Sequence, residues 1–195
     1  MTSQTIVKMD GITKAFAGIK ALNNVKIDLR QGEVHALMGE NGAGKSTLMK
    51  IMTGVYSKDA GTMYLHNPSS GQLEEVDIKS PLAGQKLGLS MVFQEFNLLE
   101  NMNIAENIFI GREPLGTGQT VDRKQLLQKA EEELKKVNLD IDPEIEVSKL
   151  SCGQKQCVEI AKALSFHARV VVFDEPTASL SEKESQTLFK LIRRL

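Results

Sequence analysis

A glycine-rich stretch near the N-terminus carries the residues best suited to chemistry: MGENGAGKSTLMKIMTG, from Met38 to Gly54. It contains the pattern GxxxxGK[ST], whose glycines let backbone N–H groups converge on phosphate oxygens at the start of a helix. Lys45 would offer a mobile positive charge to β and γ phosphates, and the Ser46 hydroxyl could ligate Mg²⁺. The stretch predicts a nucleoside triphosphate site. The residues expected around the nucleotide are Gly39, Glu40, Asn41, Gly42, Ala43, Gly44, Lys45, Ser46 and Thr47.

A pair of acids forms the second chemical feature. In VVVFDEP an apolar strand delivers Asp174 and Glu175 at its carboxyl end, the edge at which open α/β sheets bind their ligands. Asp174 is expected to hold Mg²⁺ through water, and Glu175 to polarise the water that attacks the γ phosphate. An isolated Asp-Glu pair is more often a solvated strand end, but a phosphate loop in the same chain favours hydrolysis.

The residues around the glycine-rich stretch predict the elements that position it. Apolar and polar residues alternate through residues 25–30, a turn follows at Gln31-Gly32, and residues 34–38 (VHALM) predict a short buried strand. These two strands are expected to form a hairpin-like pair. Apolar residues at helical spacing then predict a helix over residues 46–53, ended by Gly54.

The middle of the chain predicts a small β patch and then a helical insert. GTMYLHN and VDIKSP flank a Pro-Ser-Ser-Gly turn and predict antiparallel strands, and LGLSMVFQ predicts a buried strand ending at Gln94. Residues 97–150 are expected to form an inserted α-helical subdomain within a single nucleotide-binding domain over residues 1–195. In this insert Asp122 is expected to cap an amphipathic helix that ends at Asn138.

Three elements are expected near the C-terminus. Residues 154–164 and 181–195 have helical patterns, and Val170–Phe173 is an apolar strand of the kind found in parallel sheets. Cys152 and Cys157 are too few for a disulfide framework and are spaced unlike paired CxxC zinc ligands, so both are expected to be reduced thiols.

Composition limits the classes of function. The chain is 41% hydrophobic and 25% charged with a net charge of −1, so no basic excess is present to neutralise nucleic acid. Residues 1–10 lack the apolar core of a secretory signal, and no apolar run approaches the ~20 residues that cross a bilayer. A cytosolic protein is expected, with any membrane link made through a partner.

The stretch KLSCGQKQCVEIAKAL connects the chain to a family. Residues 150–154, LSCGQ, resemble the LSGGQ signature of ATP-binding cassette (ABC) ATPases, with Cys152 where a glycine is most common. Ser151 stands at an N-cap and Gly153 leaves the backbone open, which suits a helix start to a γ phosphate. The resemblance implies that two cassettes pair head to tail, so that Ser151, Gly153 and Gln154 close over the nucleotide bound by the other cassette.

The same resemblance assigns further roles and a fold. It implies that Phe16 stacks on adenine, and that the Q-loop residue Gln94 touches Mg²⁺ and the attacking water. The metal ligands are then Ser46, Gln94 and Asp174. The implied fold is an α/β P-loop NTPase with a RecA-like core, a small antiparallel β subdomain and an inserted α-helical subdomain. The motifs occur in the family's order over nearly the whole chain.

Two departures from the family pattern stand near the C-terminus. In ASLS, residues 178–181, Ser181 occupies the place of an aspartate that contacts the other cassette. The family's switch histidine is expected after one further strand, which the sequence does not contain. His35, His66 and His167 are expected inside a strand, in a turn and before the acid strand, so none can replace it. A fragment of a longer polypeptide is expected, with little or no ATP hydrolysis of its own.

Three stretches resemble the first cassette of monosaccharide importers of the ribose, galactose and xylose group: TGVYSKDAGTMYLHN, FQEFNLLENMNIAENIFIGREP and GQKQCVEIAKALSFHARVVVFDEPTASLSEKE. This resemblance implies sugar import on the cytoplasmic side of the membrane. The implied partners are membrane permease subunits, on which the helical insert docks, a second cassette in the same longer chain or another copy, and indirectly a sugar-binding protein.

Two other classes remain as alternatives. DNA-repair or chromosome-organising ATPases of the same superfamily carry long coiled coils after the Q-loop, whereas this insert has one modest amphipathic helix. A translation factor with paired cassettes or an inactive regulatory nucleotide sensor is the second alternative. Glu175 favours hydrolysis, and the nearly neutral charge disfavours ribosomal RNA.

Overall fold

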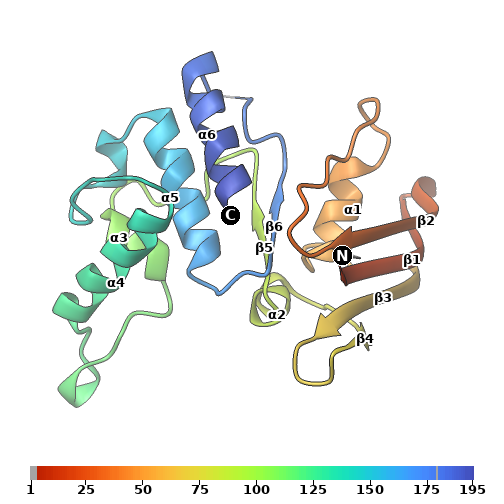
Figure 1. Cartoon of the computed structure of the whole chain (residues 1–195), viewed down its shortest axis with the longest axis horizontal. Helices are drawn as coiled ribbons and strands as arrows, with labels where there is room; N and C mark the ends of the chain where they lie inside the picture. The colour runs from red at the N-terminus through yellow and green to blue at the C-terminus, as the bar shows by residue number, and fades with distance from the viewer. Residues whose placement is uncertain (1–3, 179) are drawn as a thin grey trace. The chain divides into compact units, whose positions relative to one another are not determined.

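The computed structural model describes residues 4–178 and 180–195 (Figure 1). The chain divides into two compact units, Met1–Leu87 and Gly88–Leu195, which we call the N-terminal and C-terminal units. Ser179, within the expected contact loop of residues 178–181, lies outside the described residues.

The N-terminal unit is built on a four-stranded antiparallel sheet. The strands β1 (Thr5–Phe16), β2 (Ile19–Arg30), β3 (Ala60–Asn67) and β4 (Gln72–Val76) lie in the order β2-β1-β3-β4. The predicted antiparallel patch is confirmed as the β3–β4 part of this sheet, but its second strand is Gln72–Val76 and not the predicted VDIKSP, which has no strand after Val76. Two helices complete the unit, α1 (Lys45–Met52) and α2 (Pro81–Lys86). Its buried apolar side chains include Val7, Met9, Ile12, Leu22, Leu48, Ile51, Met52, Met63 and Leu65.

The strand predicted over residues 34–38 is wrong. This segment has no assigned strand, and the side chains of Val34 and Met38 are 67% and 88% exposed. The alternating residues of β2 pair with β1 instead, with Ile27 opposite Met9 and Leu29 opposite Val7. A short apolar run becomes a strand only where its backbone groups pair with a neighbouring strand. Although β2 lies at the edge of the sheet, residues 34–38 do not pair with it.

Two of the three histidines also differ from their expected places. His35 belongs to the same unpaired segment, where its Nδ1 lies 3.2 Å from a carboxylate oxygen of Glu33. His66 lies within β3 rather than in a turn, and its ring contacts the Gln4 side chain. His167 does precede the acid strand, in a left-handed backbone conformation.

The C-terminal unit has a short parallel sheet. Strands β5 (Leu89–Val92) and β6 (Val170–Phe173) pair in register, from Leu89 opposite Val170 to Val92 opposite Phe173. Strand β5 ends two residues before Gln94. The helices of this unit are α3 (Ile104–Phe109), α4 (Arg123–Lys136), α5 (Cys152–Leu164) and α6 (Glu182–Arg194), with 3₁₀ turns at Thr117–Gln119 and Val147–Lys149.

Helices α3, α4 and α5 pack against one another around one hydrophobic core (Figure 1). The predicted stripe on α4 is confirmed, since Leu126, Ala130 and Leu134 are buried in that core. Asp122 caps α4 as expected: its carboxylate accepts a 3.0 Å hydrogen bond from the Gln125 N–H. Among the residues that the structure describes, every helix is too short or too polar to span a lipid bilayer.

Candidate functional site

The phosphate loop ends at a position that only glycine can occupy. Gly44 is the N-cap of α1 and has φ 88° and ψ 5°, a left-handed conformation. A Cβ atom at Gly44 would lie 2.4 Å from the Ala21 carbonyl oxygen and 2.7 Å from a methyl group of Leu22. Strand β2 therefore lies directly against the end of the loop, and the loop is shaped by this close approach.

Lys45 folds back across the loop. Its Nζ donates hydrogen bonds of 2.7 Å to the Gly39 carbonyl and 2.8 Å to the Glu40 carbonyl. The first turn of α1 holds no acidic residue, and no side chain from the described residues caps it. An ammonium group and the positive end of a helix thus belong to one loop, an arrangement that favours an anion.

Phe16 lies at the end of β1, before a tight turn through Ala17 and Gly18, both in the left-handed region. Its ring is 40% exposed and makes an edge-to-face contact with Tyr56, with ring centroids 5.3 Å apart. Tyr56 follows α1 in the chain. The aromatic residue expected to meet adenine therefore belongs to the same unit as the phosphate loop.

The structure brings Gln94 and Asp174 to the same edge of the parallel sheet. Asp174 directly follows β6, and its N–H donates a 3.0 Å hydrogen bond to the Val92 carbonyl at the end of β5. Gln94 is exposed two residues beyond that strand, whereas the Asp174 side chain is buried. Carboxyl ends of neighbouring parallel strands are where such sheets bind ligands.

Glu175 differs from Asp174 in conformation and exposure. Its φ is 49°, in the left-handed region that non-glycine residues rarely adopt, and its side chain is exposed. Residues held in this region cost about 1–3 kcal/mol each and cluster at functional sites. Asp174 is therefore buried at the end of β6, whereas the next residue, Glu175, is exposed to solvent.

The signature residues begin α5 with a complete capping box. The Ser151 hydroxyl accepts a 3.3 Å hydrogen bond from the Gln154 N–H, and the Gln154 side-chain oxygen accepts a 2.9 Å bond from the Ser151 N–H. The expected N-cap at Ser151 is confirmed. Cys152, where a glycine is most common in the family, is the first residue of the helix and is exposed.

A carboxylate also stands at this helix start. Glu184 Oε1 accepts a 3.1 Å hydrogen bond from the Gly153 N–H, while its Oε2 accepts from the Ser181 N–H and hydroxyl at the start of α6. Hydrogen bonds from Ser181, and to a smaller extent from Gly153, lower the pKa of Glu184 below its usual value. Ser181, which replaces the family's aspartate, thus caps α6 and binds Glu184.

Sequence reasoning missed two residues of α5 that hold the chain after Gln94. The Glu159 carboxylate accepts a hydrogen bond from the Asn97 N–H, and Lys162 Nζ donates a 2.9 Å bond to the Asn97 carbonyl. Burial raises the pKa of Glu159 and lowers that of Lys162. The only signal in the sequence is an acid in the apolar stripe of α5, beside Ile160.

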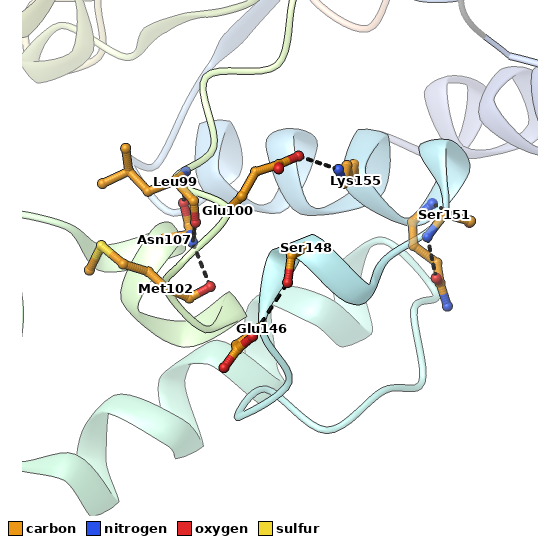
Figure 2. Close-up of polar contacts among 9 residues, drawn as sticks. Leu99, Glu100, Met102, Asn107, Glu146, Ser148, Ser151 and Lys155 are labelled. Carbon is orange, nitrogen blue, oxygen red and sulfur yellow. Dashed lines mark hydrogen bonds and ion pairs between the residues drawn. The ribbon is translucent and has the colours of Figure 1, made fainter.

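The chain beyond Asn97 is fixed just as closely (Figure 2). Glu100 and Lys155 of α5 form an ion pair with a 2.6 Å separation. The fully buried Asn107 amide accepts from the Leu99 N–H at 2.7 Å and donates to the Met102 carbonyl at 3.3 Å. Helix α5 therefore links the signature at its start to the segment that follows Gln94.

The expected metal ligands, Ser46, Gln94 and Asp174, are of the type that binds a hard cation such as Mg²⁺, which keeps several of its water ligands. Across the described residues, no three His, Cys, Asp or Glu side chains gather where they could hold a metal ion. Ser46, Gln94 and Asp174 offer a hydroxyl, an amide and one carboxylate, which are oxygen donors of the kind that Mg²⁺ accepts beside phosphate oxygens. Ser46 belongs to the N-terminal unit, and the other two belong to the C-terminal unit.

Comparison with known proteins decides the family. The family described as ABC transporter matches residues 22–178, which is most of the 195-residue chain. The chain belongs to the ABC transporter family. The match includes the phosphate loop, Gln94, the signature and the acid pair.

Relatives among ABC transporter proteins carry sugar-import names. The chain is 48% identical over its full length to a Burkholderia cenocepacia protein with a provisional ribose/galactose/methyl galactoside import ATP-binding name. It is 46% identical over 97% of its length to the ribose import ATP-binding protein RbsA 2 of Streptomyces coelicolor. These alignments cover 37% and 35% of the two relatives, so the chain spans little more than a third of their length.

Solved ABC transporter cassettes share the fold. A nucleotide-free ATP-binding cassette matches 97% of this chain with a TM-score of 0.83 and 28% identity, and 76% of that cassette is covered. The ADP form of the cassette MJ1267 matches 98% of the chain with a TM-score of 0.82 and 28% identity, again over 76% of that cassette. The predicted α/β P-loop NTPase fold with an antiparallel β subdomain is confirmed.

Proposed function

We propose that this chain binds ATP, and that the protein of which it forms the cassette hydrolyses ATP to power monosaccharide import through a membrane permease. The observation that carries the proposal is the phosphate loop, in which Lys45 and the start of α1 offer positive charge to one anion. The relatives' sugar-import names support the transport role over a translation factor, a DNA-repair ATPase or a regulatory sensor.

Binding uses groups that the loop already orients. The Lys45 ammonium exchanges the Gly39 and Glu40 carbonyls for phosphate oxygens, a change that needs only side-chain rotation. Gly42 and Gly44 keep the backbone free of side chains where the phosphates approach. Phe16 supplies an exposed ring for the adenine. Ser46, Gln94 and Asp174 are the residues assigned to Mg²⁺, which would neutralise charge on the phosphate oxygens.

Hydrolysis depends on the edge of the parallel sheet. Gln94 and Glu175 are both exposed at this edge, and we assign them the positioning and polarisation of the attacking water. Such a role needs geometry more than covalent chemistry. Ser151, Gly153 and Gln154 are assigned to the nucleotide of a second cassette, in the same longer chain or another copy.

The proposed partners follow from the sugar-import relatives. Permease subunits receive the helical insert of residues 97–150, a sugar-binding protein acts indirectly, and no nucleic acid is involved. The proposed location is the cytoplasmic side of the membrane, bound through the permease.

Titration calorimetry with Mg·ATP tests nucleotide binding. We expect the chain to bind ATP and Lys45→Ala to weaken binding at least tenfold, because the only lysine of the loop is lost. Lys86→Ala, which removes the same charge from the end of α2, should bind like the unmodified chain. Equal affinity of the Lys45→Ala variant and the unmodified chain would contradict the proposal that the phosphate loop binds ATP.

Turnover in the complete transporter tests the catalytic role. Glu175→Gln should keep ATP binding and lose most ATP turnover and sugar uptake, since the amide is a poor base. Equal turnover by the variant and the unmodified transporter would contradict the role given to Glu175.

A further inference from the structure

The N-terminal unit contains an aromatic pair and an acid that the phosphate site does not use. We propose that Tyr56 and Asp59 position Phe16 as the platform for the nucleobase. They thereby determine how much more tightly the chain binds ATP than a triphosphate without a base. This inference rests on the proposed ATP binding and deepens it, because it concerns the base end of the same site.

Tyr56 supports the Phe16 ring from the side. The two rings lie 5.3 Å apart with an interplanar angle of 66°, the edge-to-face arrangement that aromatic pairs prefer. Both rings are partly exposed, at 40% for Phe16 and 36% for Tyr56. The pair therefore restrains Phe16 while leaving ring surface for another flat group. Stacking of a base on such a ring adds to binding affinity without depending on the identity of the base.

Helix α1 carries this support. The Val55 and Tyr56 N–H groups both donate to the Lys50 carbonyl, at 2.8 Å and 3.0 Å, so the residues after the helix wrap onto its last turn. Lys50 Nζ also lies 5.6 Å from the centre of the Tyr56 ring. One helix thus holds the phosphate loop at its start and the partner ring at its end.

Asp59 fixes the end of β1 from the other direction. Its carboxylate accepts a 2.8 Å hydrogen bond from the Ala15 N–H and a 2.6 Å bond from Lys14 Nζ. Its own N–H donates to the Thr13 carbonyl at 2.9 Å. Pairing between β1 and β3 is irregular just before this point, with a register shift between Asp10 and Thr13. Asp59 therefore replaces ladder contacts in the residues that lead directly to Phe16.

The charge around Asp59 keeps this contact in place near neutral pH. The Lys14 ammonium, followed by the Ala15 N–H, lowers the pKa of Asp59 below its usual value. Lys14 Nζ lies 5.5 Å from the centre of the Phe16 ring as well. The Lys14–Asp59 ion pair therefore lies at the end of β1, next to the Phe16 ring.

The base platform and the phosphate loop lie close along β2. Phe16 pairs with Ile19, and the Ala21 carbonyl is the group that approaches Gly44 most closely. Ile19 and Ala21 are two residues apart, or about 7 Å along an extended strand. One short stretch of β2 therefore connects the two ends of the site within the N-terminal unit.

Calorimetry of the whole chain with two probes tests the inference. The affinity for Mg·ATP includes contacts with the base and the phosphates, whereas the affinity for inorganic tripolyphosphate with Mg²⁺ includes contacts with phosphates alone. We expect Tyr56→Ala and Asp59→Ala to weaken ATP binding about five- to tenfold, as expected from partial loss of the stacking described above. Both variants should bind tripolyphosphate as the unmodified chain does, which also shows that the loop is folded.

Three matched variants identify the interactions responsible. Tyr56→Phe keeps the ring and should retain ATP affinity. Asp77→Ala removes another lysine-paired acid of the same unit, bonded to Lys58 at 3.2 Å, and should leave both affinities unchanged. Tyr56→Ala should have no further effect once Phe16→Ala has removed the platform.

The outcomes separate this inference from the proposed function. If Tyr56→Ala weakened ATP and tripolyphosphate equally, or if Tyr56→Phe were as weak as Tyr56→Ala, the positioning role would be overturned. An unmodified chain that bound tripolyphosphate as tightly as ATP would overturn the platform and leave the phosphate loop intact. A chain that bound neither probe would overturn both proposals.

Discussion

Two helices of this protein begin at sites assigned to phosphate, and their N-termini are built in opposite ways. Helix α1 starts from Gly44, whose left-handed backbone brings no side chain to the first N–H groups. Helix α5 starts from Ser151 with a reciprocal capping box, and the Glu184 carboxylate accepts from the Gly153 N–H. Both helix starts carry the positive end of a dipole. At α5 the Glu184 carboxylate accepts from one of the first N–H groups, whereas the first turn of α1 contains no acidic residue of its own.

Because the two helix starts differ in this way, anion binding has different requirements at α1 and at α5. An anion at α1 meets Lys45, a cation that turns away from two carbonyls to receive it. An anion at α5 meets a carboxylate of the same unit, which repels it and holds one of the donors it needs. On the proposed assignment, phosphate binding at the signature would require Glu184 to move, whereas binding at the loop would displace the two hydrogen bonds of Lys45.

The largest effect is expected at Gly44. In Gly44→Ala the new methyl group meets the Ala21 carbonyl at 2.4 Å, so β2 or the loop must shift. We expect a loss of about 3 kcal/mol in the free energy of unfolding and no measurable ATP binding, measured by urea denaturation and calorimetry. Gly42→Ala is the matched control, because Gly42 also has a positive φ, of 84°, but has open space around it. Its cost should stay near 1 kcal/mol, and equal costs would contradict the role of close packing.

A smaller effect is expected when the cap of α5 is removed. Ser151→Ala deletes the hydroxyl that accepts from the Gln154 N–H and should lower the free energy of unfolding by about 1 kcal/mol. The control variant Ser148→Ala removes an exposed hydroxyl that makes a long 3.4 Å contact with Glu146, and it should change the free energy of unfolding little. If both variants unfolded at the same urea concentration, the capping box would not stabilise α5.

The sequence predicted those features that depend on neighbours in the chain. The phosphate loop, the caps at Asp122 and Ser151, and the stripe of α4 all follow from spacing within a few residues. The strand predicted over residues 34–38 is wrong because an apolar run forms a strand only together with a partner strand, and this segment pairs with no strand of the described residues.

The contacts that distinguish the two helix starts could not be predicted in this way. Glu184 and Gly153 are 31 residues apart, and each has an ordinary local role as part of a capping box or a glycine after a cap. Glu159 and Asn97 are 62 residues apart. Only the packing of the C-terminal unit brings these pairs together, and no local pattern marks them.

Anion binding at α5 is expected to depend on the charge of Glu184. Glu184→Gln removes the charge that opposes an anion while an amide oxygen can still accept from Gly153. We expect inorganic phosphate to raise the melting temperature of this variant slightly more than that of the unmodified chain, since binding to the native state stabilises it. Lys45→Ala in both backgrounds removes the contribution of the α1 loop. An equal response of the two chains would show that Glu184 does not oppose anions at α5.

The smallest effect concerns the pH dependence of two acids that accept from backbone N–H groups: Glu184 of α6, which accepts from Gly153, and Glu159 of α5, which accepts from Asn97. The pKa of Glu184 is lowered by its hydrogen bonds, so its stabilising contribution is present above pH 4.5 and is lost as the pH falls through its folded-state pKa. Burial raises the pKa of Glu159, so its contribution is present below pH 4.5 and is lost as the pH rises through its folded-state pKa. Urea denaturation of each chain between pH 3 and pH 7 should therefore give opposite changes. Glu159→Gln should gain stability relative to the unmodified chain as the pH rises above about 4.5, because the amide needs no buried charge to accept from Asn97. Glu184→Gln should gain relative stability as the pH falls below that value, and changes of the same sign in both variants would contradict the distinction between a solvated and a buried acid.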